Sequence, residues 1–365
     1  MTAAQPTVAS LGTSRARGAV LGAAVGDAAG FPALYHRSIR VGRRRRNLWR
    51  FAAELDRHQI LRFPLPYTQG RPDGLQVCGT DDAEFLAVGA LILLRSDGFG
   101  SDSLFACWQQ LVGEAGDALW CGIAERSALV NAARGLRPPQ TGNDNPAHYD
   151  DGAVLRAVAA GVRFAGDPDR AAEVARTLAQ ITHADDGVWA AEAMAATIAA
   201  VVGGASLESA LDEGLERIPD ETWLSRRMDA ALRLAERTTS PFDLAAELND
   251  HVANASYGFG TVAPETLASA FAIARVAEGD PGLAIPAAAT VIKQADSMPA
   301  MVGAITGAVA GAERLPQAWA TKVATLRGIC IPTLAGVSLV DLADELLAAG
   351  PGASQSPPPG ETAEE

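Results

Sequence analysis

Two groups of oxygen-bearing residues lie far apart in this chain, and each stands directly ahead of an apolar helical stretch. Thr80-Asp81-Asp82 precedes a stretch that begins at Phe85, and Asp296-Ser297 precedes one that begins at Met301. Carboxylate, hydroxyl and water oxygens are the ligands that a hard cation such as Mg²⁺ or Ca²⁺ takes in proteins. If the fold brings the two helix starts together, the pattern predicts one cation site.

The same residues also have a structural interpretation. Asp and Thr commonly cap helices, because a side-chain oxygen accepts from the free backbone N–H groups of the first turn and negative charge suits the positive end of the helix dipole. For either group alone, capping is the more common explanation. The combination of the two groups is what favours a site.

The elements that must position these residues are predicted to be helices. Ala-rich, periodically apolar segments such as 154–158 and 190–196 recur along the chain, and alternation of β-branched residues is scarce, so we expect an all-α fold. No linker rich in Pro, Ser or Gly divides the chain, which predicts one compact domain over residues 14–349. Residues 1–13 and the Pro- and Glu-rich tail 350–365 are predicted to be disordered.

Charge and cysteine content exclude some classes of function. A net charge of −13 argues against general binding of nucleic acid or of anionic membranes. The N-terminus has no basic region ahead of an apolar stretch, and we expect no apolar run of membrane length, so the chain is predicted to be cytoplasmic. The four cysteines lack C-x-x-C pairing and zinc-like spacing with histidine. A monomer and a homodimer are both compatible with the sequence.

One basic segment departs from the acidic average. Seven arginines lie between Arg37 and Arg50. They form either a solvated loop or a clamp for phosphates or an acidic partner, which the bidentate guanidinium geometry would suit.

The first helix is predicted to start near Arg15 and to run to about Pro32. Its small residues recur at spacings of three and four, so another helix can approach it closely. Asp27 on such a face is unusual. It either accepts hydrogen bonds in the interior or holds a metal ligand or a metal-bound water in place.

The order of the motifs resembles that of the ADP-ribosylglycohydrolase family, over roughly residues 15 to 326. The resemblance is carried by the following segments: G-A-V-L-G-A-A-V-G-D-A-A-G-F-P from Gly18, Thr80-Asp81-Asp82, Asp150-Asp151-Gly152 with Ala153 to Arg156 (similar to the family's G-N-G-x-x-x-R), Thr182-His183, Gly258-Phe259-Gly260, Pro264-Glu265-Thr266-Leu267, and G-A-I-T-G-A-V-A-G-A from Gly303.

The resemblance implies an all-α fold with a central cleft that holds one or two Mg²⁺ or Mn²⁺ ions and hydrolyses an N- or O-glycosidic bond to ADP-ribose. Thr80, Asp81 and Asp82 match the first metal-ligand group of the family, and Asp296 is the best match in the last one. The reading from residue chemistry and the resemblance therefore agree on the metal ligands.

Two departures from the family pattern argue against a complete two-metal site. The last motif of the family is Asp-Thr-Asp-Thr, whereas this chain has Asp296-Ser297-Met298-Pro299-Ala300-Met301, without the second Asp. Aligned without a gap, Asp296 also falls two residues early. The early glutamate of the family is replaced by Ala33-Leu34-Tyr35. We therefore expect one Mg²⁺ or Mn²⁺ ion.

The substrate-binding residues are predicted at two places, each with a structural alternative. Asp150-Asp151-Gly152 contacts the substrate or its ribose, or simply caps a helix. Tyr257 with Gly258-Phe259-Gly260 forms an aromatic loop that stacks on a nucleobase, or a plain turn. His183 reads mainly as a buried, hydrogen-bonded histidine.

The resemblance and the acidic residues together predict a metal-dependent hydrolase of an ADP-ribosylated protein or small molecule. Hydrolysis of a ribosyl bond passes through an oxocarbenium-like state and needs an activated water. We expect Asp82 to act as the general base, a role that Asp81 could share, with Asp81 and Thr80 mainly as ligands. The alternatives are an N-ribosyl hydrolase of a smaller nucleoside-like metabolite and a degenerate protein that binds ADP-ribose or a partner without turnover.

Overall fold

The computed structural model describes residues 8–30, 77–253, 259–291 and 293–350, and within them the regular structure is helical. The only pairings of extended backbone among these residues are two isolated bridges, Asp150 with Val262 and Thr325 with Ser338. The all-α prediction is therefore confirmed. The helices are α1 (Val8–Gly30), α4 (Asp81–Arg95), α5 (Ser101–Gly113), η2 (Gly116–Ala118), α6 (Ile123–Ala133), α7 (Gln140–Asn143), α8 (Gly152–Arg163), α9 (Pro168–Ala179), α10 (Asp186–Gly203), α11 (Leu207–Leu215), α12 (Trp223–Ala235), α13 (Pro241–His251), α14 (Ala263–Val276), α15 (Pro281–Ala289), α16 (Met298–Ala310), η3 (Ala312–Arg314), α17 (Gln317–Val323), η4 (Pro332–Leu334) and α18 (Leu339–Ala348).

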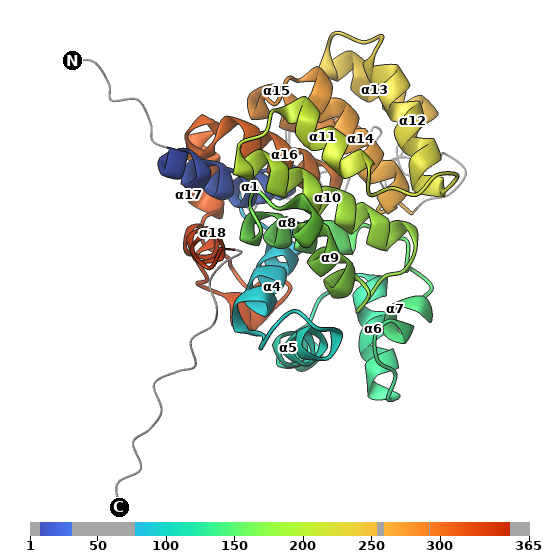
Figure 1. Cartoon of the computed structure of the whole chain (residues 1–365), viewed down its shortest axis with the longest axis vertical. Helices are drawn as coiled ribbons and strands as arrows, with labels where there is room; N and C mark the ends of the chain where they lie inside the picture. The colour runs from blue at the N-terminus through green and yellow to red at the C-terminus, as the bar shows by residue number, and fades with distance from the viewer. Residues whose placement is uncertain (1–7, 31–76, 254–258, 292, 351–365) are drawn as a thin grey trace, which may run out of the picture.

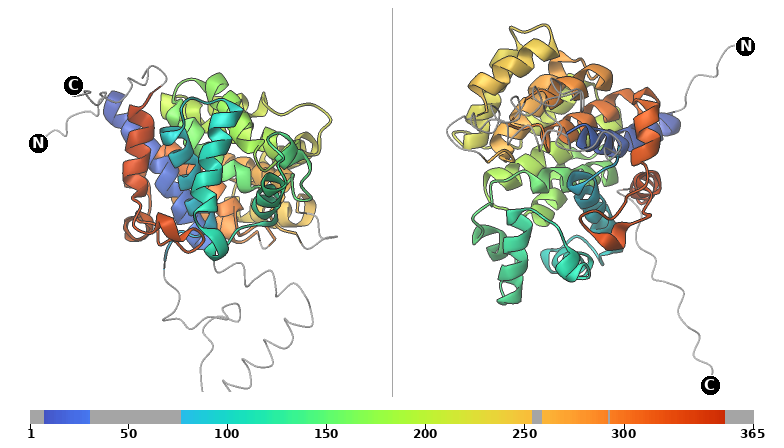
Figure 2. Two further views of the ribbon diagram at one scale, coloured as in Figure 1. Left: turned by 90° about the horizontal axis from the view of Figure 1, so that it is seen from below. Right: turned by 180° about the vertical axis from the view of Figure 1, so that it is seen from behind.

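The helices form one body around a shared core. Helices α12, α13 and α15 gather at one end and α5, α6 and α7 at the opposite end, while α1, α8, α10 and α16 run through the middle (Figure 1). Helix α10 packs against α8, α9 and α11, and α4 packs against α8. Helices α1, α4 and α18 lie side by side (Figure 2). The first helix of the chain thus sits among elements from its far end.

Helix α10 corrects the expectation that the chain has no apolar run of membrane length. By length and composition alone, its residues 186–203 could cross a membrane, but 83% of that span is buried inside the protein. The helix also carries the buried Glu192 and Thr197. Apolar residues all around a helix are typical of the centre of a large core, which is the place that α10 occupies.

The closest helix contact is between α1 and α16. A Cβ added at Gly18, Gly22 or Gly26 would lie within 2.1 Å of a backbone oxygen of α16. A Cβ at Gly30 would lie 2.5 Å from the backbone oxygen of Asp296. The small residues therefore let the two backbones touch, as the sequence predicted, and the contact brings the end of α1 to the start of α16.

Helix α1 begins at Val8 rather than near Arg15, so residues 8–13, predicted to be disordered, form its first turns. The physical reason is tertiary. The Ser14 hydroxyl donates to Glu313, and the Arg17 guanidinium donates to both carboxylate oxygens of Asp344 at 2.6 and 2.7 Å. These contacts fix the helix just beyond the predicted start and favour its continuation. Residues 1–7, the arginine segment and the tail after Gly350 lie outside the described residues.

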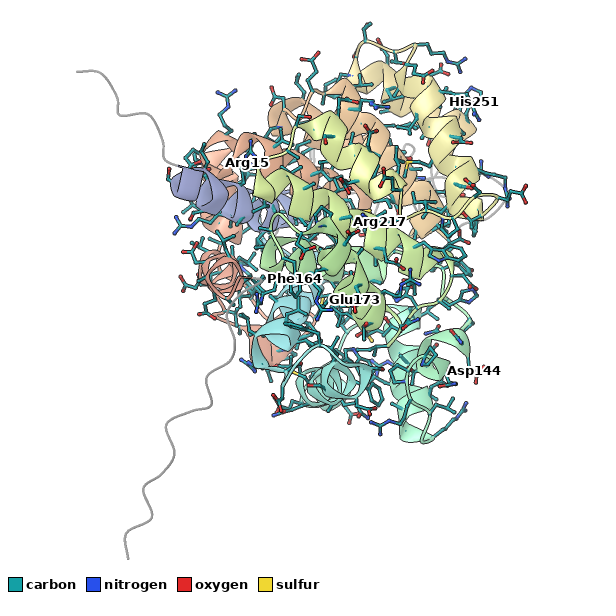
Figure 3. All side chains as sticks on the ribbon, in the orientation of Figure 1. Arg15, Asp144, Phe164, Glu173, Arg217 and His251 are labelled. Atoms are coloured by element: carbon teal, nitrogen blue, oxygen red, sulfur yellow. The ribbon has the colours of Figure 1, made fainter. Side chains whose placement is uncertain are left out.

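A buried carboxylate on α10 gives the stability of the fold a predictable pH dependence. Glu192 is 3% exposed, and its Oε2 accepts from Arg176 Nη2 of α9 at 2.7 Å. Burial raises the pKa of Glu192 from 4.5 to about 7, and the charges of Arg176 and Arg217 offset only part of that cost. Figure 3 labels Arg217 and also Glu173, which lies on α9.

We expect the unfolding free energy to fall as the pH rises from about 4.5 through about 7, since the folded state binds the Glu192 proton more tightly than the unfolded chain does. In Glu192→Gln this part of the fall should be absent. The unfolding free energy of the variant minus that of wild type should therefore be larger at pH 8 than at pH 4.5. Urea unfolding of both proteins across this range measures it. Glu173→Gln, at an exposed position on α9, should keep the wild-type slope. Parallel slopes for wild type and Glu192→Gln would contradict the prediction.

Candidate functional site

The starts of four helices, α4, α6, α8 and α16, face one cavity of about 70 Å³. A single buried water needs only about 10–15 Å³ on this measure, so the cavity has room for a hydrated ion or a small polar group. The positive ends of these four helices meet there, and this partly offsets the acidic character of the wall. The lining residues are Asp81, Asp82, Phe85, Gly122, Ala124, Glu125, Asp150, Asp151, Gly152, His183, Thr261 and Ser297.

Asp27 of α1 holds the start of α4. Its Oδ2 accepts from the backbone N–H groups of Thr80 at 2.5 Å and of Ala83 at 3.0 Å, and its Oδ1 accepts from the Thr80 hydroxyl. Thr80 does not cap α4 with its own side chain. Asp27 therefore accepts hydrogen bonds in the interior, which is the first of the two roles predicted for it. The residue that it holds in place is Thr80, a predicted metal ligand. Burial and the nearby Asp81 raise the pKa of Asp27 to about 7, despite the three hydrogen bonds.

Asp82 is the point on which the acidic residues converge. Its side chain is largely buried, and burial, followed by the charges of Asp81, Asp27, Asp296 and Asp151, holds its pKa well above the ordinary value. These carboxylates come from the starts of α4, α8 and α16 and from α1. The structure thus brings together the two groups that are more than two hundred residues apart in the sequence.

The donors at this point fit a hard divalent cation in type and in charge. They are carboxylate and hydroxyl oxygens. Burial and then mutual repulsion raise the pKa of Asp82, and a cation would relieve the repulsion. Among the described residues, no three His, Cys, Asp or Glu side chains already stand as a group that could hold a metal ion. Mg²⁺ commonly binds through one or two carboxylates and keeps several waters, so the donor set remains compatible with it.

The last motif has no place for a second aspartate. Met298 and Ala300, where an alignment without a gap puts the two aspartates of the family, are apolar and fully buried. Ser297 is the N-cap residue of α16 and lines the cavity without making a side-chain cap. Asp296 is half-buried just before it. The start of α16 therefore lines the cavity with Ser297, and Asp296 acts on Asp82 through its charge.

The first predicted substrate-binding place can be located in full and the second in part. Asp150, Asp151 and Gly152 all line the cavity, and Asp151, the N-cap residue of α8, makes no side-chain cap. Phe259 is half-buried and packs edge-on against Tyr149 with centroids 6.2 Å apart, and Gly260 is buried. Neither residue lines the cavity. Tyr257 and Gly258 lie outside the described residues.

A buried polar chain that the sequence did not reveal leads to the cavity. Trp108 Nε1 donates to Glu125 Oε1 at 2.6 Å, and Glu125 Oε2 accepts from Arg156 Nη1 at 2.6 Å. Arg156 Nη2 contacts the Thr182 hydroxyl, which lies 2.6 Å from His183 Nδ1. His183 Nε2 lies 2.5 Å from Asp150 Oδ1. His183 is buried and hydrogen-bonded, as predicted from the sequence. It also lines the cavity.

Glu84 is a further buried residue whose role the sequence did not reveal. It is fully buried in the first turns of α4, and its carboxylate accepts from the backbone N–H groups of residues 329, 330 and 331 at 2.6, 2.9 and 2.7 Å. Three bonds to one carboxylate account for its burial. They also hold Cys330 beside the acidic cluster, where burial and the charges of Asp81 and Glu84 raise the pKa of its thiol far above the ordinary value.

Comparisons with known proteins agree with this fold. A family model described as ADP-ribosylglycohydrolase matches residues 9–355. A solved structure titled "ADP-ribosylglycohydrolase-related protein complex" is similar to this chain with a TM-score of 0.59 and 23% identity, over 92% of this chain and 98% of that one. At that identity the likeness supports the fold alone. No curated protein matches the chain.

Proposed function

Because the chain belongs to the ADP-ribosylglycohydrolase family, a family of hydrolases, we propose that it is a metal-dependent enzyme that cleaves a glycosidic bond to ADP-ribose on a protein or small molecule. The observation that carries the proposal is the group of carboxylates whose charges act on the buried Asp82, at a cavity where four helices begin. A ribosyl bond breaks through a cationic, oxocarbenium-like state, and a wall of carboxylates stabilises such a charge.

In this proposal Thr80, Asp81, Asp82 and Asp296 hold one Mg²⁺ or Mn²⁺ ion. When bound, the ion would supply Lewis acidity that orients water and makes it more acidic. The protein residues then have separate tasks. Asp27 fixes the backbone and hydroxyl of Thr80, so that the hydroxyl oxygen keeps a set position.

Asp82 is the proposed general base. It would take a proton from the attacking water while the water oxygen bonds to the anomeric carbon and the glycosidic bond breaks with its electron pair going to the leaving group.

The volume of the cavity favours a second candidate. About 70 Å³ is small beside the roughly 300–1,000 Å³ of usual ligand pockets. A single ribosyl unit needs less room than ADP-ribose, so an N-ribosyl hydrolase of a smaller nucleoside-like metabolite is the runner-up. The departures in the last motif motivate a third candidate, a protein that binds ADP-ribose without turnover.

Calorimetric titration of chelator-stripped protein with ADP-ribose, with and without Mg²⁺, tests the proposal together with an assay for release of ADP-ribose from ADP-ribosylated protein. We expect binding that requires Mg²⁺, accompanied by release. Binding without release would favour the non-catalytic candidate. No binding in either condition would reject ADP-ribose as the ligand class and direct the search to smaller ribosides.

A further inference from the structure

We propose that a second cavity, formed by α9, α10 and the end of α11, binds a small organic dication of the alkyl diamine class, with one ammonium group donating to the buried carboxylate of Glu192. The cavity measures about 350 Å³ and shares no lining residue with the cavity at Asp82. Two of its lining residues, Glu173 and Arg217, are labelled in Figure 3. The charged residues that line it are Asp169, Glu173, Arg176, Glu192, Glu216 and Arg217.

This second cavity has a buried floor and an exposed rim. Ala172 and Glu192 are buried, whereas Asp169, Glu173 and Glu216 are exposed. Its volume lies within the roughly 300–1,000 Å³ of usual ligand pockets. A small molecule can therefore enter between the helices and meet a polar group at the bottom.

That polar group, Glu192, has one oxygen without a hydrogen bond. Its Oε2 accepts from Arg176 Nη2 at 2.7 Å, but none of the described residues donates to its Oε1. Most buried side-chain polar atoms have a hydrogen-bond partner. Arg176 is 53% exposed, so water can solvate it without Glu192, and its side chain is free to change rotamer as a ligand enters. An N–H donor from a ligand would complete the hydrogen bonds of Glu192.

The charge of the lining favours a ligand with two positive charges. Four carboxylates and two guanidiniums line the cavity, so two negative charges remain when Glu192 is ionised. Both guanidiniums are already engaged, Arg176 with Glu192 at 2.7 Å and Arg217 with Asp169 at 2.6 Å. Glu216 is the C-cap residue of α11, where the negative end of the helix dipole also favours a cation.

Two charged neighbours behind the lining leave this balance unchanged. Arg170 pairs with Glu173, and Glu213 pairs with Arg217 at 3.3 Å, so one adds a positive charge and the other a negative charge.

The donor groups favour an organic cation over a metal ion. Over the described ranges, no three His, Cys, Asp or Glu side chains form a group that could hold a metal. A single buried oxygen with charged residues farther out instead fits an ammonium group on an alkyl stem, which supplies N–H donors at one point. The apolar Ala172 on the floor offers contact to the stem.

Calorimetric titration of full-length, chelator-treated protein with 1,4-diaminobutane at pH 8 tests the proposal, with butylamine as the singly charged comparison. We expect the diamine to bind about tenfold more tightly than butylamine. Glu192→Gln should weaken diamine binding about 10–100-fold, because it removes a charged acceptor. Glu216→Gln, at the exposed rim, should weaken it a few-fold with no effect on folding. Circular dichroism checks that both variants are folded.

Two further variants separate this cavity from the acidic cavity at Asp82 and from general attraction to an acidic protein. Asp82→Asn and Asp102→Asn, the latter at an exposed position on α5, should keep the wild-type affinity for the diamine. No binding by wild type would overturn the proposal. Loss of binding in Asp82→Asn, with wild-type affinity in folded Glu192→Gln and Glu216→Gln, would also overturn it. None of these measurements requires hydrolytic activity.

The pH dependence of diamine binding is a second readout for Glu192. Burial raises the pKa of Glu192 to about 7, and the charges of Arg176 and Arg217 oppose the shift. Alkylamines keep their proton near neutral pH, so Kd should rise about tenfold for each pH unit below about 7, as Glu192 must lose its proton to bind the cation. The other titratable residues that face the cavity, Asp169, Glu173 and Glu216, remain in Glu192→Gln. The same pH dependence in wild type and in Glu192→Gln would overturn the assignment to Glu192.

Discussion

Asp82→Asn is expected to lower kcat for release of ADP-ribose about 10²–10⁴-fold, the scale for loss of a general base. The variant keeps the shape of the side chain but removes a proton acceptor and a predicted metal ligand. Asp82 stands in the first turn of α4, largely buried and surrounded by the charges of Asp81, Asp27 and Asp296. Because removal of one negative charge relieves their repulsion, the melting temperature should stay the same or rise.

Asp102→Asn is the matched control for this variant. Asp102 is also the second residue of its helix, α5, but its side chain is 87% exposed and pairs with Arg137 at the surface. Its replacement should leave kcat within a factor of about two, since exposed ion pairs contribute little. Asp81→Ala should reduce turnover as Asp82→Asn does, because Asp81 lines the same cavity. An Asp82 variant that folds, binds Mg²⁺ and turns over at the wild-type rate would remove Asp82 from the mechanism.

The features of the site that sequence could reveal are those that follow local rules. Thr80, Asp81 and Asp82 stand at a helix start because a polar run precedes an apolar one, and this pattern is visible without a fold. The glycines of α1 likewise reveal a close helix contact through their spacing alone. The meeting of the two groups could be inferred only as a condition of the cation hypothesis. In the structure, Asp81, Asp82 and Ser297 line one cavity, and the charge of Asp296 acts on Asp82.

The features that sequence could not reveal depend on contacts between distant segments. Glu84 reads as an ordinary acidic residue in the first turn of a helix, yet it is fully buried because it binds the backbone of residues 329–331. Glu125 reads in the same way at the start of α6, yet it neutralises Arg156. The early start of α1 also has a tertiary cause, since Ser14 and Arg17 are tied to residues near the end of the chain. Periodicity identifies a buried face but does not identify the partner of a buried charge.

Gly22→Ala is expected to destabilise the protein by about 3 kcal/mol, at the upper end of the usual cost of overpacking. The new Cβ would lie 2.1 Å from the backbone oxygen of Gly303 and 3.2 Å from the Cα of Gly307. Both neighbours are helix backbone, which cannot turn away as a flexible side chain can, so α1 and α16 must separate. Urea unfolding followed by circular dichroism measures the loss.

Gly12→Ala supplies the control within the same helix. A Cβ at Gly12 meets nothing within 4 Å, so the variant should be stabilised by about 0.5–1 kcal/mol, as alanine favours the helix over glycine. Equal stabilities for the two variants would mean that α1 and α16 are not in backbone contact. The contact also bears on the site, since α1 carries Asp27 and α16 follows Asp296. In a Gly22→Ala protein that remains folded, Mg²⁺-dependent binding of ADP-ribose should therefore weaken, whereas in Gly12→Ala it should not.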